Sequence, residues 1–203
     1  VTQVQMNPAV NLTFAAAIKT FLRQDPDIIL VGEIRDNETA EAAIQASLTG
    51  HLVLSTLHTN DSPTAIARLI EMEVEPFLIS SSLAVVIGQR LVRKTCPHCQ
   101  EEVSADDYIK STFLRAGIEI NSYIKGKGCS NCFNTGYRGR IGIFEMLEIT
   151  DSLRSLINKR ASSYDIKEAA RKEGFRTMFE YGAELVKKGI TTPSEVLSVT
   201  KVD

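Results

Sequence analysis

The 203-residue chain can form one large domain, or one domain with small additions. It is 43% hydrophobic and 24% charged and has no low-complexity tract, so it can build a real core. A net charge of −2 argues against nucleic-acid binding driven by bulk charge, and since no apolar run approaches the ~18 residues that cross a bilayer, we expect no transmembrane span.

The first part of the chain predicts a strand, a helix and a second strand. Residues 1–8 alternate in hydrophobicity and end at a proline, as a short strand does. Residues 13–24 carry apolar side chains at helical spacing, and Thr13 is a suitable N-cap. Four consecutive aliphatic residues within 27–33 then predict a strand buried on both faces between helices, which is typical of a parallel sheet.

A βαβ unit is predicted from this strand onward. Asp36 can cap a helix over residues 37–49, Gly50 can end it, and an aliphatic strand follows at 51–57. Two strands joined by one helix within about thirty residues should be parallel neighbours. Their carboxyl ends therefore open on the same edge of the sheet.

Four polar side chains follow these two strand ends: Glu33, Arg35, Thr56 and His58. Ligands of open α/β sheets bind at this edge, and a carboxylate there can hold a water in line with a phosphate. The simpler interpretation is a buried strand followed by a solvated loop, with His58 an ordinary loop histidine. The pairing of Glu33 with His58 across a βαβ unit favours a phosphate site.

Helical patterns dominate the rest of the chain. One helix is expected to begin at Ser62-Pro63, and another to span 77–92, where the basic residues at 90, 93 and 94 would complement the dipole of the last turn; a phosphate or subunit contact is the alternative. Residues 135–147 predict a strand whose glycines indicate a close backbone approach or a bulge. The last helices are expected at residues 151–159, 162–174, 178–188 and from Thr192, where Glu195 would complete a capping box.

The four cysteines form two Cys-x-x-Cys pairs, Cys96/Cys99 and Cys129/Cys132. Two such knuckles supply a tetrahedral all-sulfur ligand set for zinc, and a closed shell of four thiolates indicates a structural rather than a catalytic site. The long polar spacer between the knuckles should hold a structured insertion. His98 is the outside candidate for a ligand and we expect it not to bind. A pair of redox-active dithiols is the remaining alternative.

Several segments of the sequence resemble the conserved motifs, or boxes, of a known family. Residues 22–27 with 31–36, and residues 49–61, are similar to the Walker B and His boxes of the type II secretion and type IV pilus assembly ATPases, the GspE/PilB group. The similarity continues through residues 89–93, the four cysteines and residues 136–143, so it covers nearly the whole chain. Pilus retraction motors share the first two boxes but lack the cysteine insertion, which favours secretion or assembly.

The resemblance implies an α/β protein with a RecA-like P-loop NTPase core, which works as a homo-hexamer on the cytoplasmic face of the bacterial inner membrane through platform proteins. It implies ATP with Mg²⁺ as substrate and cofactor, and a structural Zn²⁺. By the same resemblance Glu33 activates the attacking water and His58 senses or stabilises the γ-phosphate. Gly32 stands where the usual Walker B aspartate would, and Arg35 and Thr56 support the nucleotide site. The cysteines 96, 99, 129 and 132 are the zinc ligands.

The chain departs from the family in one respect, since no Gly-x-x-x-x-Gly-Lys-Ser/Thr loop occurs in it. Because it also begins with Val1 rather than with methionine, we expect it to be the C-terminal portion of a longer motor. We expect residues 1–93 to be the C-terminal part of the ATPase core, 94–140 the inserted zinc subdomain, and 141–203 a returning strand with a C-terminal helical subdomain. This piece alone should neither bind ATP tightly nor hydrolyse it.

The sequence leaves several alternatives open. Type II secretion, through assembly of a pseudopilus, is the main expectation, and type IV pilus assembly or a DNA-uptake pilus is the alternative within the family. Outside the family, the chain could be a zinc-bearing nucleic-acid module or a non-catalytic scaffold. The acidic net charge and the lack of a basic stripe with interleaved aromatic residues argue against nucleic acid.

Overall fold

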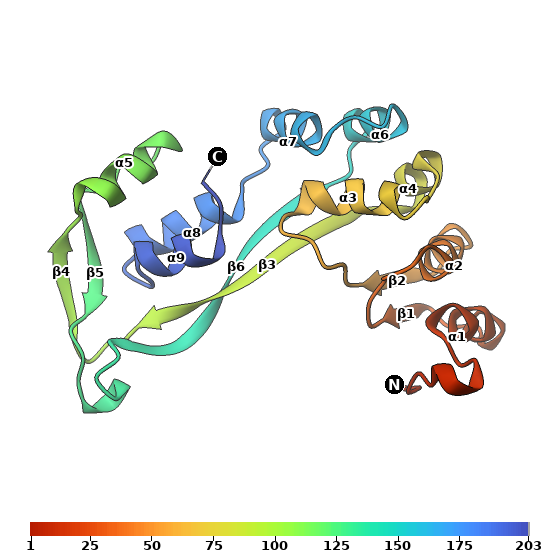
Figure 1. Cartoon of the computed structure of the whole chain (residues 1–203), viewed down its shortest axis with the longest axis horizontal. Coiled ribbons are helices and arrows are strands. Elements are labelled where there is room, and N and C mark those ends of the chain that lie inside the picture. Colours follow the sequence, from red (N-terminus) through yellow and green to blue (C-terminus); the bar gives the residue numbers. More distant parts are fainter. Residues whose placement is uncertain (203) are drawn as a thin grey trace. The chain divides into compact units, whose positions relative to one another are not determined.

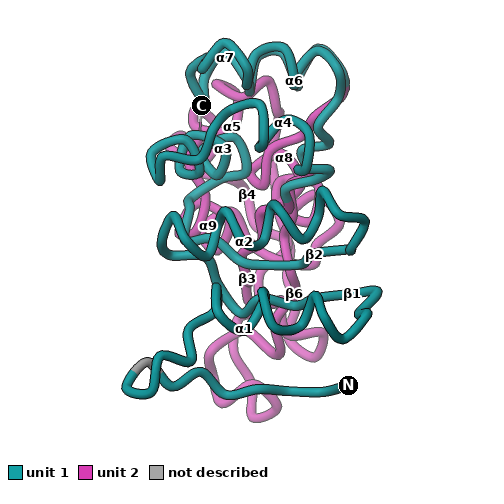
Figure 2. Tube along the Cα trace, turned by 90° about the vertical axis from the view of Figure 1, so that its right-hand side faces the viewer, with its two compact units in different colours: residues 1–86, 147–173 teal, residues 87–146, 174–203 magenta. Residues whose placement is uncertain are grey.

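The computed structural model describes residues 1–202, apart from the side chain of Pro8. The chain forms two compact units, each built from two segments: residues 1–86 with 147–173, and residues 87–146 with 174–203 (Figure 2). The chain passes from one unit to the other within each of two long paired strands, β3 (Val85–Thr95) and β6 (Tyr137–Glu148), and again after Glu173.

The first unit is an αβαβα arrangement followed by helices (Figure 1). Aspartates cap two of its helices: Asp36 and Asp61 each accept a hydrogen bond of 2.8 Å from the backbone N–H three residues on. Its elements are η1 (Pro8–Val10), α1 (Phe14–Phe21), η2 (Leu22–Gln24), β1 (Ile28–Val31), α2 (Asn37–Leu48), β2 (Leu52–Ser55), α3 (Ser62–Glu71), α4 (Pro76–Ser82), α6 (Asp151–Asn158) and α7 (Ser163–Lys172).

Strands β1 and β2 pair in parallel, with Ile28 opposite Leu52 and Val31 opposite Ser55, which confirms the predicted βαβ unit. One face of β1 packs on α1 and α2 through Ile29 and Val31. The expectation that β1 is buried on both faces is wrong, since its other face leaves Ile28 60% and Leu30 73% exposed. The physical reason is that the described residues place helices against one face of this pair only.

The second unit contains most of the two long strands, a second pair of strands and three helices. Its elements beyond β3 and β6 are β4 (Gln100–Ser104), α5 (Asp107–Arg115), β5 (Ser122–Gly126), η3 (Ser130–Cys132), α8 (Met178–Lys187) and α9 (Pro193–Val199). Strands β4 and β5 are antiparallel. Phe113 of α5 is fully buried and meets the Phe179 ring of α8 at a centroid distance of 4.9 Å. The structured insertion predicted between the knuckles is therefore a strand, a helix and a strand, held by an apolar core that it shares with α8 and α9.

Two predicted elements are wrong. Residues 1–8 form no strand, and only Asn7 makes an isolated bridge, to Leu12. The helix predicted over 77–92 ends at Ser82, and β3 begins at Val85. Two adjacent valines and an isoleucine at 85–87 favour a strand, and pairing with β6 provides the partner that local periodicity could not reveal. The basic residues at 90–94 are thus on a strand and complement no helix dipole.

The remaining helices agree with the sequence. Ser162 and Thr177 cap α7 and α8 with both arms of a capping box. Helix α3 begins at Ser62, although its cap is Asp61. Strand β6 begins two residues after the start of the strand predicted at 135–147 and ends one residue beyond it. Within the described residues, no helix combines the length and the apolar character that crossing a membrane requires.

Candidate functional site

The carboxyl ends of β1 and β2 are tied to one another beyond the strand pairing. The backbone N–H of Ile34 donates to the carbonyl of Thr56 at 3.0 Å, and the Thr56 hydroxyl donates to the carbonyl of Gly32 at 2.7 Å. A Cβ at Gly32 would lie 3.6 Å from the Phe14 ring, an ordinary contact, so Gly32 acts here through its backbone. Residues 32–34 and 56–58 are therefore one joined edge.

Glu33 is the centre of a small charged cluster at this edge. Its Oε2 atom lies 2.6 Å from Nε of Arg35 and 3.1 Å from Nε2 of His58. The Glu33 side chain is 25% exposed, whereas those of Arg35 and His58 are 69% and 80% exposed. Its other oxygen, Oε1, has no hydrogen-bond partner among the described residues.

The electrostatics of the cluster favour an ionised carboxylate. The hydrogen bond from Arg35 is the largest cause that lowers the pKa of Glu33 below its ordinary value, and His58 acts in the same direction against the effect of burial. An anionic Glu33 with one free oxygen can accept a proton or a hydrogen bond from a water, while Arg35 and His58 are exposed donors beside it. The structure thus brings together all five residues predicted for this site: Gly32, Glu33, Arg35, Thr56 and His58.

The four cysteines lie close together at the other candidate site. All four sulfurs are within 4.8 Å of one another. The Sγ–Sγ distances are 3.9 Å for Cys96–Cys129, 3.9 Å for Cys99–Cys132 and 3.7 Å for Cys129–Cys132. Zn–S bonds of about 2.3 Å give a tetrahedron with sulfur–sulfur edges of roughly 3.8 Å, so the sulfur cluster fits zinc. The exposed His98 lies outside this cluster.

The backbone around the second knuckle is shaped to present sulfur. The N–H groups of Cys129 and Gly136 donate to the Cys132 sulfur at 3.2 Å and 3.3 Å. Phe133 and Asn134 both adopt left-handed φ angles, +51° and +58°. The close approach expected from the glycines is found at Gly136, because a Cβ on the facing Gly126 would lie 2.1 Å from its carbonyl oxygen.

The thiol pKa values diverge within the cluster. Burial raises the pKa of Cys99 to about 12. Burial also disfavours the thiolate of Cys132, yet the N–H groups of Cys129 and Gly136, together with the thiols of Cys129 and Cys99, outweigh it and lower the pKa of that thiol to about 6. The charge of a divalent cation at the centre would stabilise all four sulfurs as thiolates. A cation held by four thiolates has no open position for a substrate, so its role would be structural.

Sequence reasoning missed the side chain that closes the turn after the second knuckle. The Thr135 hydroxyl donates to the carbonyl of Cys132 at 2.6 Å and accepts from the N–H of Tyr137 at 3.3 Å. A threonine three residues after a knuckle cysteine is a local signal of such a turn. Gly126 was missed as well, because its need for close approach depends on a residue ten positions away in sequence.

The fold is shared with solved structures of a pilus retraction motor and of a bacterial ATPase. The crystal structure of the pilus retraction motor PilT with bound ADP matches with a TM-score of 0.64 and 26% identity, over 93% of this chain and 43% of that chain. The Legionella pneumophila ATPase DotB matches with a TM-score of 0.62 at 22% identity, over 92% of this chain and 42% of that chain, which shows the fold alone.

The chain belongs to the family described as Type II/IV secretion system protein, whose profile matches residues 1–198. It is 51% identical to the type IV pilus assembly ATPase PilB of Thermus thermophilus, over 98% of this chain and 23% of that protein. It is 46% identical to the type II secretion system protein HxcR of Pseudomonas aeruginosa, over 99% of this chain and 39% of that protein. The chain therefore spans less than half the length of these relatives.

Proposed function

We propose that this chain is the water-activating part of an ATPase motor that drives type II protein secretion by assembling a pseudopilus. The observation that carries this proposal is the Glu33–His58 contact of 3.1 Å at the joined carboxyl ends of two parallel strands. Ligands of open α/β sheets bind at that edge. The family and the names of the relatives support ATP as the substrate class.

Each residue of the cluster has a role that follows from its contacts. Glu33 accepts a proton from the attacking water through Oε1, because its Oε2 is already held by Arg35 and His58. His58 and Arg35 are exposed donors for the phosphate oxygens on which charge develops. Thr56 and Gly32 fix the distance between the two strand ends through their hydrogen bond. Bound Mg²⁺ supplies charge neutralisation of the phosphates.

The wider assembly is part of the same proposal. The chain is the C-terminal portion of a RecA-like core, and the complete protein works as a hexamer on the cytoplasmic face of the inner membrane, through platform proteins. The tetracysteine module is a structural zinc subdomain within residues 94–140. Relatives named as secretion-system proteins, and sulfur distances that match a zinc tetrahedron, support these statements.

Type IV pilus assembly is the second candidate, and one observation favours it. The chain is 51% identical to a pilus assembly ATPase and 47% identical to the type II secretion system protein E of Pseudomonas aeruginosa. The two functions use the same site chemistry and differ in their membrane partners. Complementation of a pilus-assembly and a secretion mutant with the complete gene separates them.

The experiment that tests the proposal is ATP turnover by the protein extended upstream to its natural start. Glu33→Gln should lower turnover by about 10²–10⁴-fold while nucleotide still binds, because the amide keeps the shape but cannot accept the proton. Glu41→Gln, an exposed glutamate on α2 of the same unit, is the matched control and should leave turnover unchanged.

The same assay distinguishes the alternatives. Equal turnover for wild type and Glu33→Gln would make Glu33 a mere strand terminus and would favour the scaffold interpretation. The 203-residue chain alone should show no turnover, and measurable hydrolysis by it would contradict the assignment of this chain as a partial site.

A further inference from the structure

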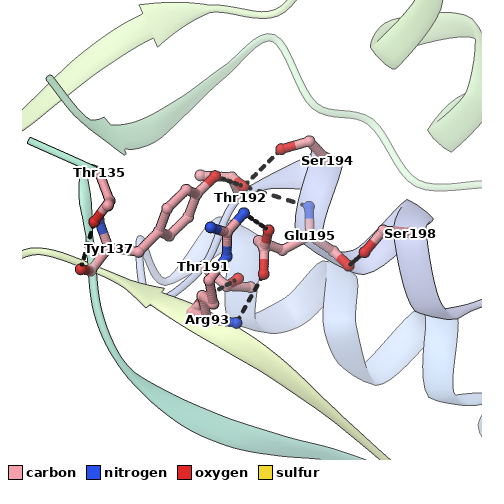
Figure 3. Close-up of polar contacts among 8 residues, drawn as sticks. All are labelled: Arg93, Thr135, Tyr137, Thr191, Thr192, Ser194, Glu195 and Ser198. Carbon is pink, nitrogen blue, oxygen red and sulfur yellow. Dashed lines mark hydrogen bonds and ion pairs between the residues drawn. The ribbon is translucent and has the colours of Figure 1, made fainter. Parts of the chain in front are cut away.

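Arg93 of β3 is held by the N-terminal turn of α9 (Figure 3). Its Nη2 atom lies 2.6 Å from Oε1 of Glu195, and its backbone N–H donates to Oε2 of the same carboxylate at 2.9 Å. The guanidinium also stacks over the Tyr137 ring at 4.1 Å from the centroid. One arginine thus joins β3, β6 and α9.

Two further hydrogen bonds close this contact. The Tyr137 hydroxyl lies 2.9 Å from Oγ1 of Thr192, the N-cap of α9, and the Thr191 hydroxyl donates to the Arg93 carbonyl at 2.8 Å (Figure 3). The Glu195 side chain is only 12% exposed, whereas that of Arg93 is 54% exposed. The carboxylate is therefore the less solvated partner and depends most on the contact. We name Arg93, Tyr137 and Glu195 the α9 lock.

Glu195 gives up a local contact to take part in this lock. Helices α7 and α8 each have an acidic residue at the third position whose carboxylate returns to the N-cap backbone, which completes a capping box. In α9 the Thr192 hydroxyl accepts from the Glu195 N–H at 3.4 Å, but the carboxylate turns to Arg93 instead. The capping box predicted for α9 is thus only half formed, because a tertiary contact with a charged partner displaces it.

The lock continues into the cysteine site without a gap. Tyr137 donates its N–H to the Thr135 hydroxyl at 3.3 Å, and that hydroxyl donates to the carbonyl of Cys132 at 2.6 Å. On β3, Thr95 lies two residues after Arg93 and donates its N–H to the Ile190 carbonyl at 2.9 Å. Both strands that carry the knuckles are therefore tied to the segment that leads into α9.

We propose that Arg93, Tyr137 and Glu195 are positioning residues of the tetracysteine metal centre, and that metal binding and the docking of α9 stabilise one another. The metal fixes Cys132, which fixes the turn through Thr135 and so the Tyr137 ring on which Arg93 stacks. In return, the docked α9 holds Tyr137 and limits the motion of the second knuckle. This coupling does not depend on the ATPase assignment.

Thermodynamic linkage makes the proposal reciprocal. If zinc increases the docking of α9 by some factor, then the lock must increase zinc affinity by the same factor. Groups that hydrogen-bond directly to metal ligands commonly change metal affinity about 10–100-fold. The α9 lock reaches Cys132 only through Thr135, so its effect should be smaller. We therefore expect a factor of about five to ten.

The test uses the 203-residue chain loaded with zinc. Glu195→Gln should weaken zinc binding about five- to tenfold in competition with a chromogenic chelator. Glu184→Gln is the matched control. Glu184 belongs to the same unit, and its ion pairs are with Arg176 and Lys188, neither of which lies on β3 or β6. It should leave zinc affinity at the wild-type value. Tyr137→Phe, which keeps the stacked ring and loses only the hydroxyl, should give a smaller loss.

Hydrogen exchange supplies the reciprocal measurement. Removing zinc from the wild-type chain should speed exchange at the backbone amides of residues 196–200 by the same five- to tenfold, and Glu195→Gln should speed exchange at these amides with zinc present. Equal zinc affinity of Glu195→Gln and Glu184→Gln overturns the proposal. Unchanged exchange in α9 after metal removal overturns it too, because any loss of affinity in Glu195→Gln would then come from general destabilisation. Retained protection of α8 in each variant shows that the unit is folded.

Discussion

Metal removal should loosen the cysteine knuckles and leave the inserted helix α5 folded. The knuckle loop over residues 127–136 has little packing of its own, since Phe133 is 89% exposed and the one buried side chain there is that of Cys132. Ordering about ten residues costs roughly 10–20 kcal/mol of backbone entropy. A structural zinc supplies about 10–16 kcal/mol, so the metal is the principal term that keeps this loop ordered.

Helix α5 rests on a different source of stability. Phe113, Ile109 and Ile120 are 0%, 8% and 4% exposed, and they pack against the buried face of α8 and α9. Each buried side chain of this kind contributes about 1.5–3 kcal/mol, so the three together contribute roughly 5–9 kcal/mol that does not depend on sulfur. Loss of the metal should therefore unfold the knuckles and leave the rest of residues 94–140 folded.

The assay is hydrogen exchange of the 203-residue chain before and after treatment with a strong chelator, followed by addition of excess zinc. Amides of residues 129–136 should lose protection and regain it with zinc, while those of 109–115 should keep it. Simultaneous loss in both segments would show that the sulfur cluster, and not the apolar core, holds α5. No change in either segment would refute the metal site.

Three further predictions concern packing and charge. Phe113→Ala should lower the free energy of unfolding by about 3–5 kcal/mol in urea titrations because the ring is fully buried, and a loss below about 1 kcal/mol would show that the pocket collapses around the change. Gly126→Ala should reduce the zinc content of purified protein because its Cβ would lie 2.1 Å from the Gly136 oxygen, and full zinc content would show that the strands can separate without harm. The Arg93 hydrogen bond lowers the pKa of Glu195 below the ordinary 4.5, so the stabilisation it gives is complete above that value and is lost as pH falls through the lowered pKa. The difference in stability between wild type and Glu195→Gln should therefore shrink below pH 4.5, and a difference that stays constant across the acidic range would contradict the ion pair.

Local patterns were sufficient for the candidate sites. Alternation of aliphatic strands with a capped helix predicted the parallel βαβ unit, and the polar residues that follow each strand had to meet at one edge because parallel strands end on the same side. The spacing of the cysteine pairs likewise predicted a four-sulfur cluster. The catalytic roles of Glu33 and His58 remain predictions, since proximity alone assigns no reaction.

Tertiary structure decided what local patterns could not express. The segment after Ser82 reads as a continued apolar helix, yet it forms β3 because β6, about fifty positions away, offers it a partner. Arg93 reads as the basic end of that helix, and Glu195 reads as half of a capping box. Each instead pairs with the other across 102 positions of sequence. The ion pair of Arg93 with the largely buried Glu195 carboxylate outweighs the hydrogen bond that this carboxylate could make to the N-cap backbone of α9. Only the folded chain brings the two side chains within reach of one another.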